Sequence, residues 1–369
     1  MRPDARQCSI VATQLDHTDV NADDPSHPGS ADPLARPTMI VWEATRAYRF
    51  PGTPDAAPAE LRARPGELST HEAVAMIDHL APFAGATLGI TGGDPLERDD
   101  LEVVVTRARS RELRVVLALG ATPRVTVHRL RKLYNLAGDA EIAVRLDGAT
   151  PEAHDTLRGF PGAYRRTLDI MQAARNVGFP VRIITTVSHQ NVGELDAMAE
   201  VVAMTGATLW SVTFLAPFGR GSTAEVLEAT EHEDVLVRLA HLRGNVPFGI
   251  SVASSPAFAR VIAQAGHPDD PQIDSASDGR GFMFISSTGD VRPSRLLPSV
   301  GNVRQDSPVE LYRSAQLFRA LRDPEQLGGR CGRCEYRQVC GGSRSSAYVF
   351  AGDPFAEDPT CTWQPVAVG

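Results

Sequence analysis

Short apolar runs alternate with amphipathic stretches from Met39 onward, and this rhythm limits the fold more than any other feature of the chain. The apolar runs predict strands over Met39–Glu43, Thr87–Thr91, Arg114–Leu119, Glu141–Leu146, Val181–Val187 and Thr208–Leu215. Apolar residues recurring every three or four positions predict helices over Thr70–Phe83, Leu101–Arg109, Thr126–Leu136, Ala163–Val177 and Val192–Met204. Six such βα repeats by about Leu242 predict an α/β fold, an incomplete, open (βα)6 barrel that binds ligands at the carboxyl ends of its strands.

The 369 residues exceed what one hydrophobic core usually serves, so a large domain and a smaller unit are expected. Residues 1–37 are rich in Asp, Pro, Ser, His and Thr without apolar periodicity, which predicts a disordered leader. We assign the barrel to residues 38–245 and a C-terminal subdomain to residues 246–369. In this subdomain we predict a hairpin over Phe282–Ser287 and Val291–Pro293, then a helix over Val309–Leu321.

Charge and hydropathy argue against two classes of partner. The net charge is -8 and no block of Lys or Arg occurs, whereas nucleic-acid binders need a basic patch to displace phosphate counterions. No run approaches the roughly 20 apolar residues that cross a bilayer, and the N-terminus lacks the pattern of a secretory signal. We therefore expect a cytoplasmic protein that binds neither nucleic acid nor membrane.

Four of the five cysteines are clustered near the C-terminus, in the spacing Cys331-x2-Cys334-x5-Cys340 with Cys361 further on, while Cys8 stands alone. In a reducing compartment such clustering favours metal ligation over disulfides. Four soft thiolates suit tetrahedral zinc or a 4Fe-4S cube. Zinc ribbons usually pair two C-x2-C knuckles and this chain has one, so iron-sulfur is favoured over zinc.

Glycines surround the cysteine array at Gly332, Gly341 and Gly342, where they suit a backbone that wraps closely around a metal centre. The alternative is a set of ordinary buried thiols. Isolated core cysteines do not normally fall into such an array, so a metal site is the better interpretation.

The cysteine segment and several upstream motifs together resemble one family. They occur in the family's order, in the segments Trp42–Ala47, Thr91–Leu96, Leu146–Gly148, His154–Arg158, Arg330–Arg344, Gly352–Pro354 and Glu357–Cys361. From Met39 to Trp363 the chain resembles radical-SAM proteins that carry a C-terminal SPASM domain. The resemblance implies a radical-SAM-type barrel with a small SPASM/twitch-like iron-sulfur subdomain, whose cysteines hold one auxiliary 4Fe-4S cluster.

The chain departs from the family in the loop after the first strand. There the family carries C-x3-C-x2-C, whose three thiolates hold the cluster that cleaves S-adenosylmethionine, and the corresponding residues here are Tyr48, Gly52 and Asp55. Tyrosine and aspartate are hard oxygen ligands that match a sulfide-bridged cube poorly, and glycine offers no side-chain ligand. The resemblance therefore implies a variant without the radical-generating cluster. Ser294, where many SPASM proteins have a first auxiliary cysteine, implies one auxiliary cluster rather than two.

Parts of a pocket for S-adenosylmethionine are also implied by the resemblance. Gly92, Gly93 and Asp94 would meet the methionine amino group, and Arg158 would face its carboxylate. An ordinary βα turn for the glycines and a surface ion pair for Arg158 are the alternatives. Arg145 replaces a serine common in the family and would place a bulky cation near the adenosine.

Three functions follow from these patterns. The first is a degenerate radical-SAM paralogue that acts as a binding or regulatory partner, or through a repurposed barrel pocket, in a maturation, cofactor or natural-product pathway. Its expected partners are a peptide, a small-molecule substrate or an intact radical-SAM paralogue. The second is an enzyme that uses S-adenosylmethionine or another small anion in non-radical chemistry, with Glu43, Asp94 and Asp147 as candidate acid–base groups. The third is a zinc-stabilised interaction module.

Overall fold

The computed structural model describes residues 36–48, 62–216, 225–266 and 277–366. These residues belong to one compact unit, Asp32–Gly369. The predicted leader up to residue 35, Cys8, Gly52 and Asp55 lie outside the described residues. No helix in the described ranges is long and apolar enough to cross a membrane.

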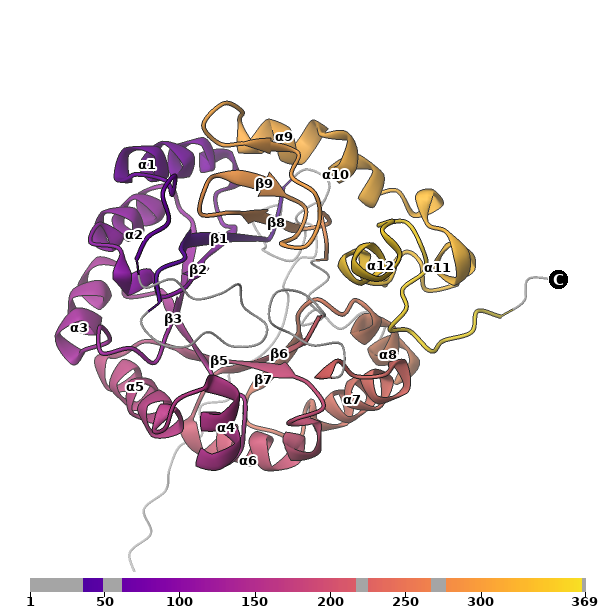
Figure 1. The fold of residues 1–369 in the computed structure, drawn as a ribbon, viewed down its shortest axis with the longest axis horizontal. Coiled ribbons are helices and arrows are strands. Elements are labelled where there is room, and N and C mark those ends of the chain that lie inside the picture. The colour runs from indigo at the N-terminus through magenta and orange to yellow at the C-terminus, as the bar shows by residue number, and fades with distance from the viewer. Residues whose placement is uncertain (1–35, 49–61, 217–224, 267–276, 367–369) are drawn as a thin grey trace, which may run out of the picture. The chain divides into compact units, whose positions relative to one another are not determined.

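A single sheet runs through the described residues in the order β10-β9-β8-β1-β2-β3-β4-β5-β6-β7. Its parallel strands are β1 (Met39–Thr45), β2 (Thr87–Gly92), β3 (Arg114–Leu119), β4 (Glu141–Arg145), β5 (Val181–Val187), β6 (Leu209–Phe214), β7 (Gly249–Val252) and β8 (Phe282–Ile285). Two short antiparallel strands, β9 (Asp290–Arg292) and β10 (Gly301–Asn302), extend the sheet beyond β8. The strands surround the middle of the view in Figure 1, with helices outside them.

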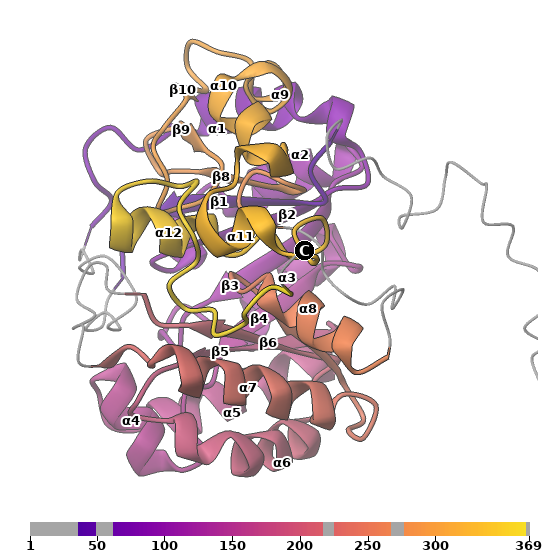
Figure 2. The same cartoon turned by 90° about the vertical axis from the view of Figure 1, so that its right-hand side faces the viewer.

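The helices fall into two groups. Those that connect the parallel strands are α1 (Thr70–His79), α2 (Leu101–Ser110), α3 (Val127–Leu136), α4 (Pro151–Arg158), α5 (Ala163–Val177), α6 (Leu195–Thr205), α7 (Ala229–Leu242) and α8 (Ala257–Gln264). Those of the C-terminal part are α9 (Pro308–Ser314), α10 (Gln316–Leu321), α11 (Gly329–Arg333) and α12 (Arg344–Ala351). Figure 2 shows the C-terminal helices alongside the strand region.

Local sequence determines where these helices begin and end. Ser69 accepts the backbone N–H of Glu72, whose side chain bonds the Ser69 backbone in return, so a capping box starts α1. Gly178 ends α5 in the left-handed conformation, which costs glycine little. Pro151 occupies the first turn of α4, where its missing N–H has no partner to lose.

The strands present alternate residues to two different environments. In β1, Ile40 and Trp42 are fully buried beneath the helices, whereas Met39 and Val41 line a cavity on the other face. The same alternation continues in the neighbouring strands, because successive side chains of a strand point to opposite faces. The residues that line the cavity include the small Gly89, Ala118, Ala143, Ser211 and Ser251. Because these side chains are small, the cavity on the inner face of the sheet stays open.

The predicted fold class is confirmed: the structure is an α/β fold with a parallel sheet. The strands Arg114–Leu119 and Val181–Val187 and the helix Ala163–Val177 have the predicted bounds. The predicted helix Thr70–Phe83 is two elements in the structure: α1 ends at His79, and a 3-10 turn follows over Ala81–Phe83. Pro82 lies in this turn and has no N–H with which to continue an α-helix.

The pattern continues further than six repeats. β7 adds a seventh parallel strand after Leu242, but its four residues are too few to show a clear alternation in the sequence. The predicted hairpin is present as β8 and β9, which pair in the antiparallel sense. β8 also pairs with β1 in parallel, from Met39 opposite Phe282 to Trp42 opposite Ile285. The sheet is therefore continuous across the boundary predicted at residue 245, and that boundary stays a prediction.

Tyr312 holds the start of β8, and its hydroxyl provides a first test of the fold. Its oxygen accepts the backbone N–H of Gly281 at 3.0 Å, and its ring packs on Phe83 and Phe318. Tyr312→Phe keeps the ring and leaves a buried N–H without its acceptor, so the free energy of unfolding should fall by about 1–3 kcal/mol. Urea denaturation measures this loss. Tyr348→Phe on α12 is the control and should change stability by less than about 0.5 kcal/mol; equal losses in the two variants would contradict the assignment.

Candidate functional site

A cavity of about 300 Å³ lies at the carboxyl ends of β1 to β4. Gly92, Gly93 and Arg158, three of the residues predicted for a pocket, line it. Other lining residues come from the strand ends and from the segment after β1: Glu43, Arg46, Tyr48, Gly120, Arg145 and Arg295. The structure therefore brings together most of the predicted pocket at the edge where parallel α/β sheets bind ligands.

The two glycines let the loop after β2 lie directly against the segment after β1. The N–H of Gly93 donates to the Thr45 carbonyl at 2.8 Å, and the N–H of Asp94 donates to the Ala47 carbonyl at 2.9 Å. A Cβ on Gly92 would lie 2.1 Å from the Thr45 oxygen, and one on Gly93 would lie 2.0 Å from the Ala47 oxygen. Glycine is required at both positions because the two backbones touch.

Asp94 points away from the cavity. It is fully buried, and one carboxylate oxygen accepts the Leu96 N–H at 3.0 Å, which caps the short turn over Pro95–Glu97. The other oxygen accepts the hydroxyl of Thr122. Burial raises the pKa of the Asp94 carboxyl. Its contacts in the structure are those of a helix cap.

Arg158 is 7% exposed and lies at the end of α4. One of its nitrogens is 3.4 Å from Asp147, and another donates to the hydroxyl of Tyr48 at 3.2 Å. Tyr48 is itself 6% exposed, and a Cβ on Gly120 would come within 2.6 Å of its ring. The tyrosine ring thus fills the wall of the cavity, with its hydroxyl directed at Arg158.

The Leu146–Gly148 motif forms a structural joint behind this wall. Asp147 donates its backbone N–H to Nδ1 of His154 at 3.0 Å and accepts the Thr186 N–H on its carboxylate at 2.9 Å. A Cβ on Gly148 would lie 2.5 Å from the His154 nitrogen, so α4 packs closely on this turn. The Nε2 atom of His154 is buried without a hydrogen-bond partner in the described residues.

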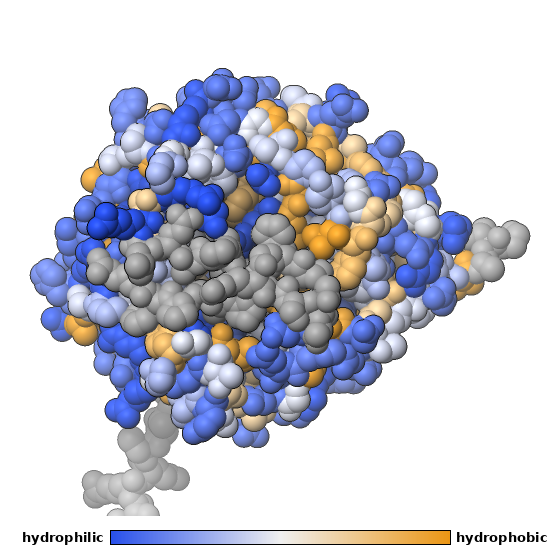
Figure 3. Space-filling model, in the orientation of Figure 1, coloured by the Kyte–Doolittle hydropathy of each residue, from blue (hydrophilic) through white to orange (hydrophobic). Residues whose placement is uncertain are grey.

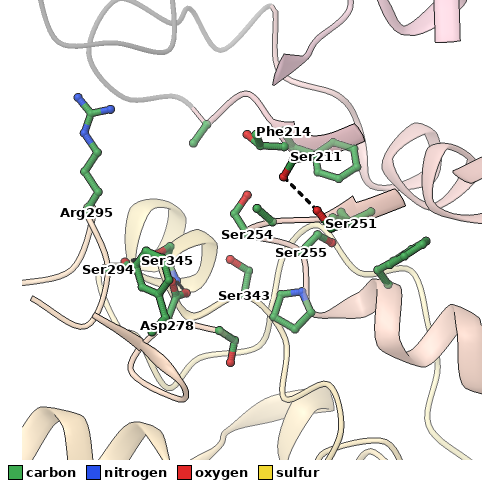
Figure 4. A pocket seen from close by; sticks show the side chains of 18 of the residues that line it. Ser211, Phe214, Ser251, Ser254, Ser255, Asp278, Ser294, Arg295, Ser343 and Ser345 are labelled. Atoms are coloured by element: carbon green, nitrogen blue, oxygen red, sulfur yellow. Dashed lines mark hydrogen bonds between the residues drawn. The ribbon is translucent and has the colours of Figure 1, made fainter. Parts of the chain in front are cut away.

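A second cavity of about 450 Å³ adjoins the first on the inner face of the sheet. Figure 4 shows serines from several elements around it, and Asp278 beside Ser294 and Ser345. The N–H and hydroxyl of Ser345 donate to Asp278 at 2.6 and 2.9 Å, and the hydroxyls of Ser294 and Ser345 are 2.5 Å apart. Burial raises the pKa of the Asp278 carboxyl. Sequence reasoning missed this cavity, because isolated serines carry no recognisable spacing.

Each of the four C-terminal thiols accepts a backbone N–H group. The donors are Asp358 for Cys331 at 3.3 Å, Tyr336 for Cys334, Gly342 for Cys340 at 3.3 Å and Trp363 for Cys361. Three of these donors lie two residues after their cysteine. Backbone N–H groups aimed at sulfur are the hydrogen bonds that orient and stabilise thiolate ligands. Each sulfur atom of this region therefore has a backbone donor.

Two buried arginines flank the thiols. Arg344 donates to Cys331 at 3.5 Å and also bonds backbone carbonyls. Arg260 of α8 is 1% exposed, pairs with Glu233 at 2.5 Å, and lies over the Trp363 ring at 5.6 Å. Its Nε is buried without a hydrogen-bond partner in the described residues. Burial opposes its charge, but Glu233, Cys361 and Cys340 together raise the pKa of Arg260.

Burial keeps the protons on three of the four thiols when no metal is bound. Burial raises the pKa of Cys340 to about 12 and also raises the pKa values of Cys334 and Cys361. A metal that binds here must displace these protons. Within the part of the chain that the structure describes, no three His, Cys, Asp or Glu side chains are arranged around a single-ion site.

Gly93→Ala tests the contact between the two loops. A Cβ at this position meets backbone, which cannot rotate away, so the free energy of unfolding should fall by about 3 kcal/mol. Gly193→Ala is the control, because a Cβ on Gly193 has nothing within 4 Å. Urea denaturation of the two variants compares them. A Gly93→Ala protein as stable as the Gly193→Ala protein would mean that the loops are further apart.

His154 should make stability depend on pH. Burial lowers the pKa of His154 to about 4 in the folded protein, whereas an unfolded histidine titrates near 6.5. The unfolded chain therefore binds the proton first, and stability is lost as pH falls from about 6.5 towards 4, by roughly 2–3 kcal/mol. His154→Asn keeps an acceptor for the Asp147 N–H and should lose less stability between pH 7 and pH 4.5 in urea titrations. Equal losses of stability in the wild type and in His154→Asn would exclude His154 as the source of the pH dependence.

This chain is similar to known proteins both in sequence and in fold. Residues 48–202 match the family described as "Radical SAM superfamily". The AdoMet-dependent heme synthase of Methanosarcina barkeri is 34% identical over 341 residues, which cover 89% of this chain and 97% of that protein. Pre-heme d1 synthase of Dinoroseobacter shibae is 27% identical, with 91% of this chain and 89% of that protein covered. Mycofactocin maturase MftC of Mycobacterium ulcerans is 30% identical, with 89% and 88% covered.

Among solved structures, Streptococcus suis SuiB bound to precursor peptide SuiA superposes with a TM-score of 0.69 at 13% identity, covering 89% of this chain and 76% of that one. At such identity the likeness concerns the fold alone. The heme synthase relative, in contrast, is similar in sequence along almost its whole length. The chain belongs to the radical SAM superfamily.

Proposed function

We propose that this chain is a radical SAM/SPASM-type protein that has lost the radical-generating 4Fe-4S cluster and works through a repurposed barrel pocket. It retains one auxiliary 4Fe-4S cluster, held by Cys331, Cys334, Cys340 and Cys361. Membership of the superfamily implies an iron-sulfur cluster and S-adenosylmethionine as cofactors.

The residues at the front of the barrel do not fit the radical-generating cluster. Tyr48 stands where the family has its first cysteine, and its hydroxyl bonds Arg158 instead of offering a thiolate. No cysteine occurs between Cys8 and Cys331, so the three thiolates of the family motif are missing from the sequence. A phenol and a carboxylate are hard ligands for which iron in a sulfide cube has little preference. Tyr48 is the observation that carries this proposal.

The residues at the C-terminus do fit a cluster. Each of the four thiols has a backbone N–H donor and the cations Arg260 and Arg344 lie near them, which favours a cluster because a cube with four thiolates is an anion. The orphaned Nε of Arg260 would gain an acceptor from such an anion. When bound, the cluster would supply electron transfer or structural cross-linking. Zinc is the alternative metal for the same thiolates.

The names of the relatives favour a role in cofactor synthesis. Two of them are named as synthases of heme or of pre-heme d1, so we assign the chain to cofactor synthesis with a tetrapyrrole as the favoured ligand class. SuiB binds a precursor peptide, and MftC is named as a maturase, so a peptide is the second candidate. An intact radical-SAM paralogue remains a proposed partner, because it would supply the radical chemistry that this chain lacks.

Iron content tests the proposal. Anaerobic reconstitution with iron and sulfide should give about four irons per chain, with brown absorption and no 5'-deoxyadenosine from dithionite and S-adenosylmethionine. Cys340→Ser should lose most of this iron, whereas Cys8→Ser should keep it. About eight irons per chain together with cleavage of S-adenosylmethionine would refute the loss, and a colourless protein with one zinc per chain would favour the zinc module.

Introducing cysteines into the loop after β1 gives a second experiment, with serines at the same positions as its control. The triple variant Tyr48→Cys, Gly52→Cys and Asp55→Cys restores the family spacing, so its reconstituted iron should rise from about four to about eight per chain. The variant Tyr48→Ser, Gly52→Ser and Asp55→Ser changes the same positions without soft ligands and should stay at about four. Equal iron in both variants would mean that more than the thiolates has been lost.

A further inference from the structure

The end of the larger cavity that is formed by β6, β7, α7 and α8 has hydroxyl groups and, among its described lining residues, no Asp, Glu, Lys or Arg. Ser211 of β6 lies opposite Ser251 of β7 in the sheet, and their hydroxyls are 3.1 Å apart. Ser254 and Ser255 follow β7 and lie on the same side of the cavity as this pair (Figure 4). The charged residues described on the cavity wall come from other parts of the fold: Arg145 from β4, Arg182 from β5, Asp278 before β8 and Arg295 after β9.

A buried histidine of α7 also lines this end of the cavity. His232 is 5% exposed, and its ring packs against the ring of Phe214 with the centroids 3.9 Å apart. Its Nδ1 atom is buried without a hydrogen-bond partner in the described residues. Buried polar atoms in native proteins are nearly always satisfied by protein or ordered water. An imidazole with an unsatisfied nitrogen in a cavity wall therefore indicates a partner inside the cavity.

The imidazole of His232 is neutral near pH 7. Burial lowers the pKa of His232 to about 4, although Asp358 and Glu233 oppose this shift. A neutral imidazole has one N–H donor and one acceptor nitrogen, and a hydroxyl group can pair with either because it both donates and accepts. A carboxylate only accepts, and it would lose its hydration here without a cation from this end of the cavity, which is costly. The partner is therefore an uncharged group.

Apolar side chains cover much of the remaining wall. Val252 of β7 and Phe258 of α8 are buried and line the cavity, and Val339 and Phe350 from the C-terminal part line it and are half exposed. On the face in Figure 3 the outer parts are mostly hydrophilic, and hydrophobic side chains gather towards the middle. A cavity with apolar walls and a few polar groups suits a ligand whose surface is mostly apolar.

The backbone after β7 is strained at the cavity wall. Ser254 has a φ of 65°, in the left-handed region that residues other than Gly, Asn and Asp seldom adopt. Strained residues of this kind concentrate at ligand sites, where the surrounding structure holds them in place. The strain at Ser254 is thus a second sign, independent of His232, that this end of the cavity receives a ligand.

We propose that the larger cavity binds a mostly apolar molecule through an uncharged hydroxyl group, with the hydroxyl on the imidazole of His232 and the apolar body along Val252 and Phe258. The imidazole is the recognising group because Ser211 and Ser251 already bond each other. This inference rests on the proposed function, since it names the ligand class of the repurposed pocket.

Binding of 2-naphthol and 2-methylnaphthalene to the full reconstituted chain at pH 7 tests this proposal, because the two probes differ only in a hydroxyl and a methyl group. His232→Phe keeps an aromatic ring against Phe214 and removes both nitrogens. Fluorescence titrations should show that this variant binds 2-naphthol about tenfold more weakly and 2-methylnaphthalene within about twofold of the wild type, since only the hydroxyl loses its partner. His241→Phe, at an exposed position of the same helix, should change neither affinity.

A crystal structure of the wild-type chain with 2-naphthol gives a second measurement that does not depend on the folding of a variant. The naphthol oxygen should lie about 3 Å from a ring nitrogen of His232. A wild type that does not bind 2-naphthol, equal effects of His232→Phe on the two probes, or a water on His232 with the naphthol elsewhere would each overturn the proposal.

The iron content of the same samples reports on the proposed function separately. About four irons per chain with equal effects on the two probes would reject the ligand class alone. About eight irons with a selective loss of 2-naphthol binding would reject the proposed function alone.

Discussion

The rest of this structure depends on the parallel pairing of β8 with β1. Its main-chain hydrogen bonds attach a strand from Phe282–Ile285 to the first strand of the barrel, although more than two hundred residues separate them. Parallel neighbours run in the same direction, so the carboxyl end of β8 and the hairpin that follows it reach the edge where parallel α/β sheets generally bind ligands. Arg295 and Ser294 lie beside the cavities for this reason, and Asp278 precedes the same strand.

The front of the barrel combines close backbone packing with a group of polar side chains. The loops after β1 and β2 still touch through two glycines, which is a demand of packing and does not depend on a cofactor. The side chains nearby are a tyrosine, two arginines and two carboxylates: Arg158 contacts Tyr48 and Asp147, and Arg295 lies near Glu43. Hydrogen bonds and ion pairs between polar side chains therefore occupy this part of the fold.

The C-terminal tail, residues 331–363, surrounds its cysteines with groups that favour a negative charge on sulfur. Its sulfur atoms are surrounded by N–H donors, and its two nearby arginines lie in places where an uncompensated cation is costly. Arg260 belongs to α8 of the barrel, so any charge that develops on the thiols also interacts with a barrel helix. A metal bound by these thiols would therefore be energetically linked to packing of the tail on the barrel, because both act on the same buried cation.

The residue pattern by itself was sufficient for the repeating strands and helices, for the hairpin and for the grouping of the four cysteines, because periodicity and spacing are local properties of a chain. It was also sufficient to see that the front loop has no cysteine. It predicted Asp94 beside the glycines as part of a ligand pocket, and only the packed structure revealed that this carboxylate faces Thr122 and caps a turn.

Tertiary structure alone decided the larger cavity on the inner face of the sheet, the position of His232 in its wall and the placement of Arg260 near the thiols. Each of these joins residues far apart in sequence through pairing of strands that no local pattern specifies. The cavity exists because small inward side chains from several strands happen to face one another, and their sum is visible only when the sheet is assembled.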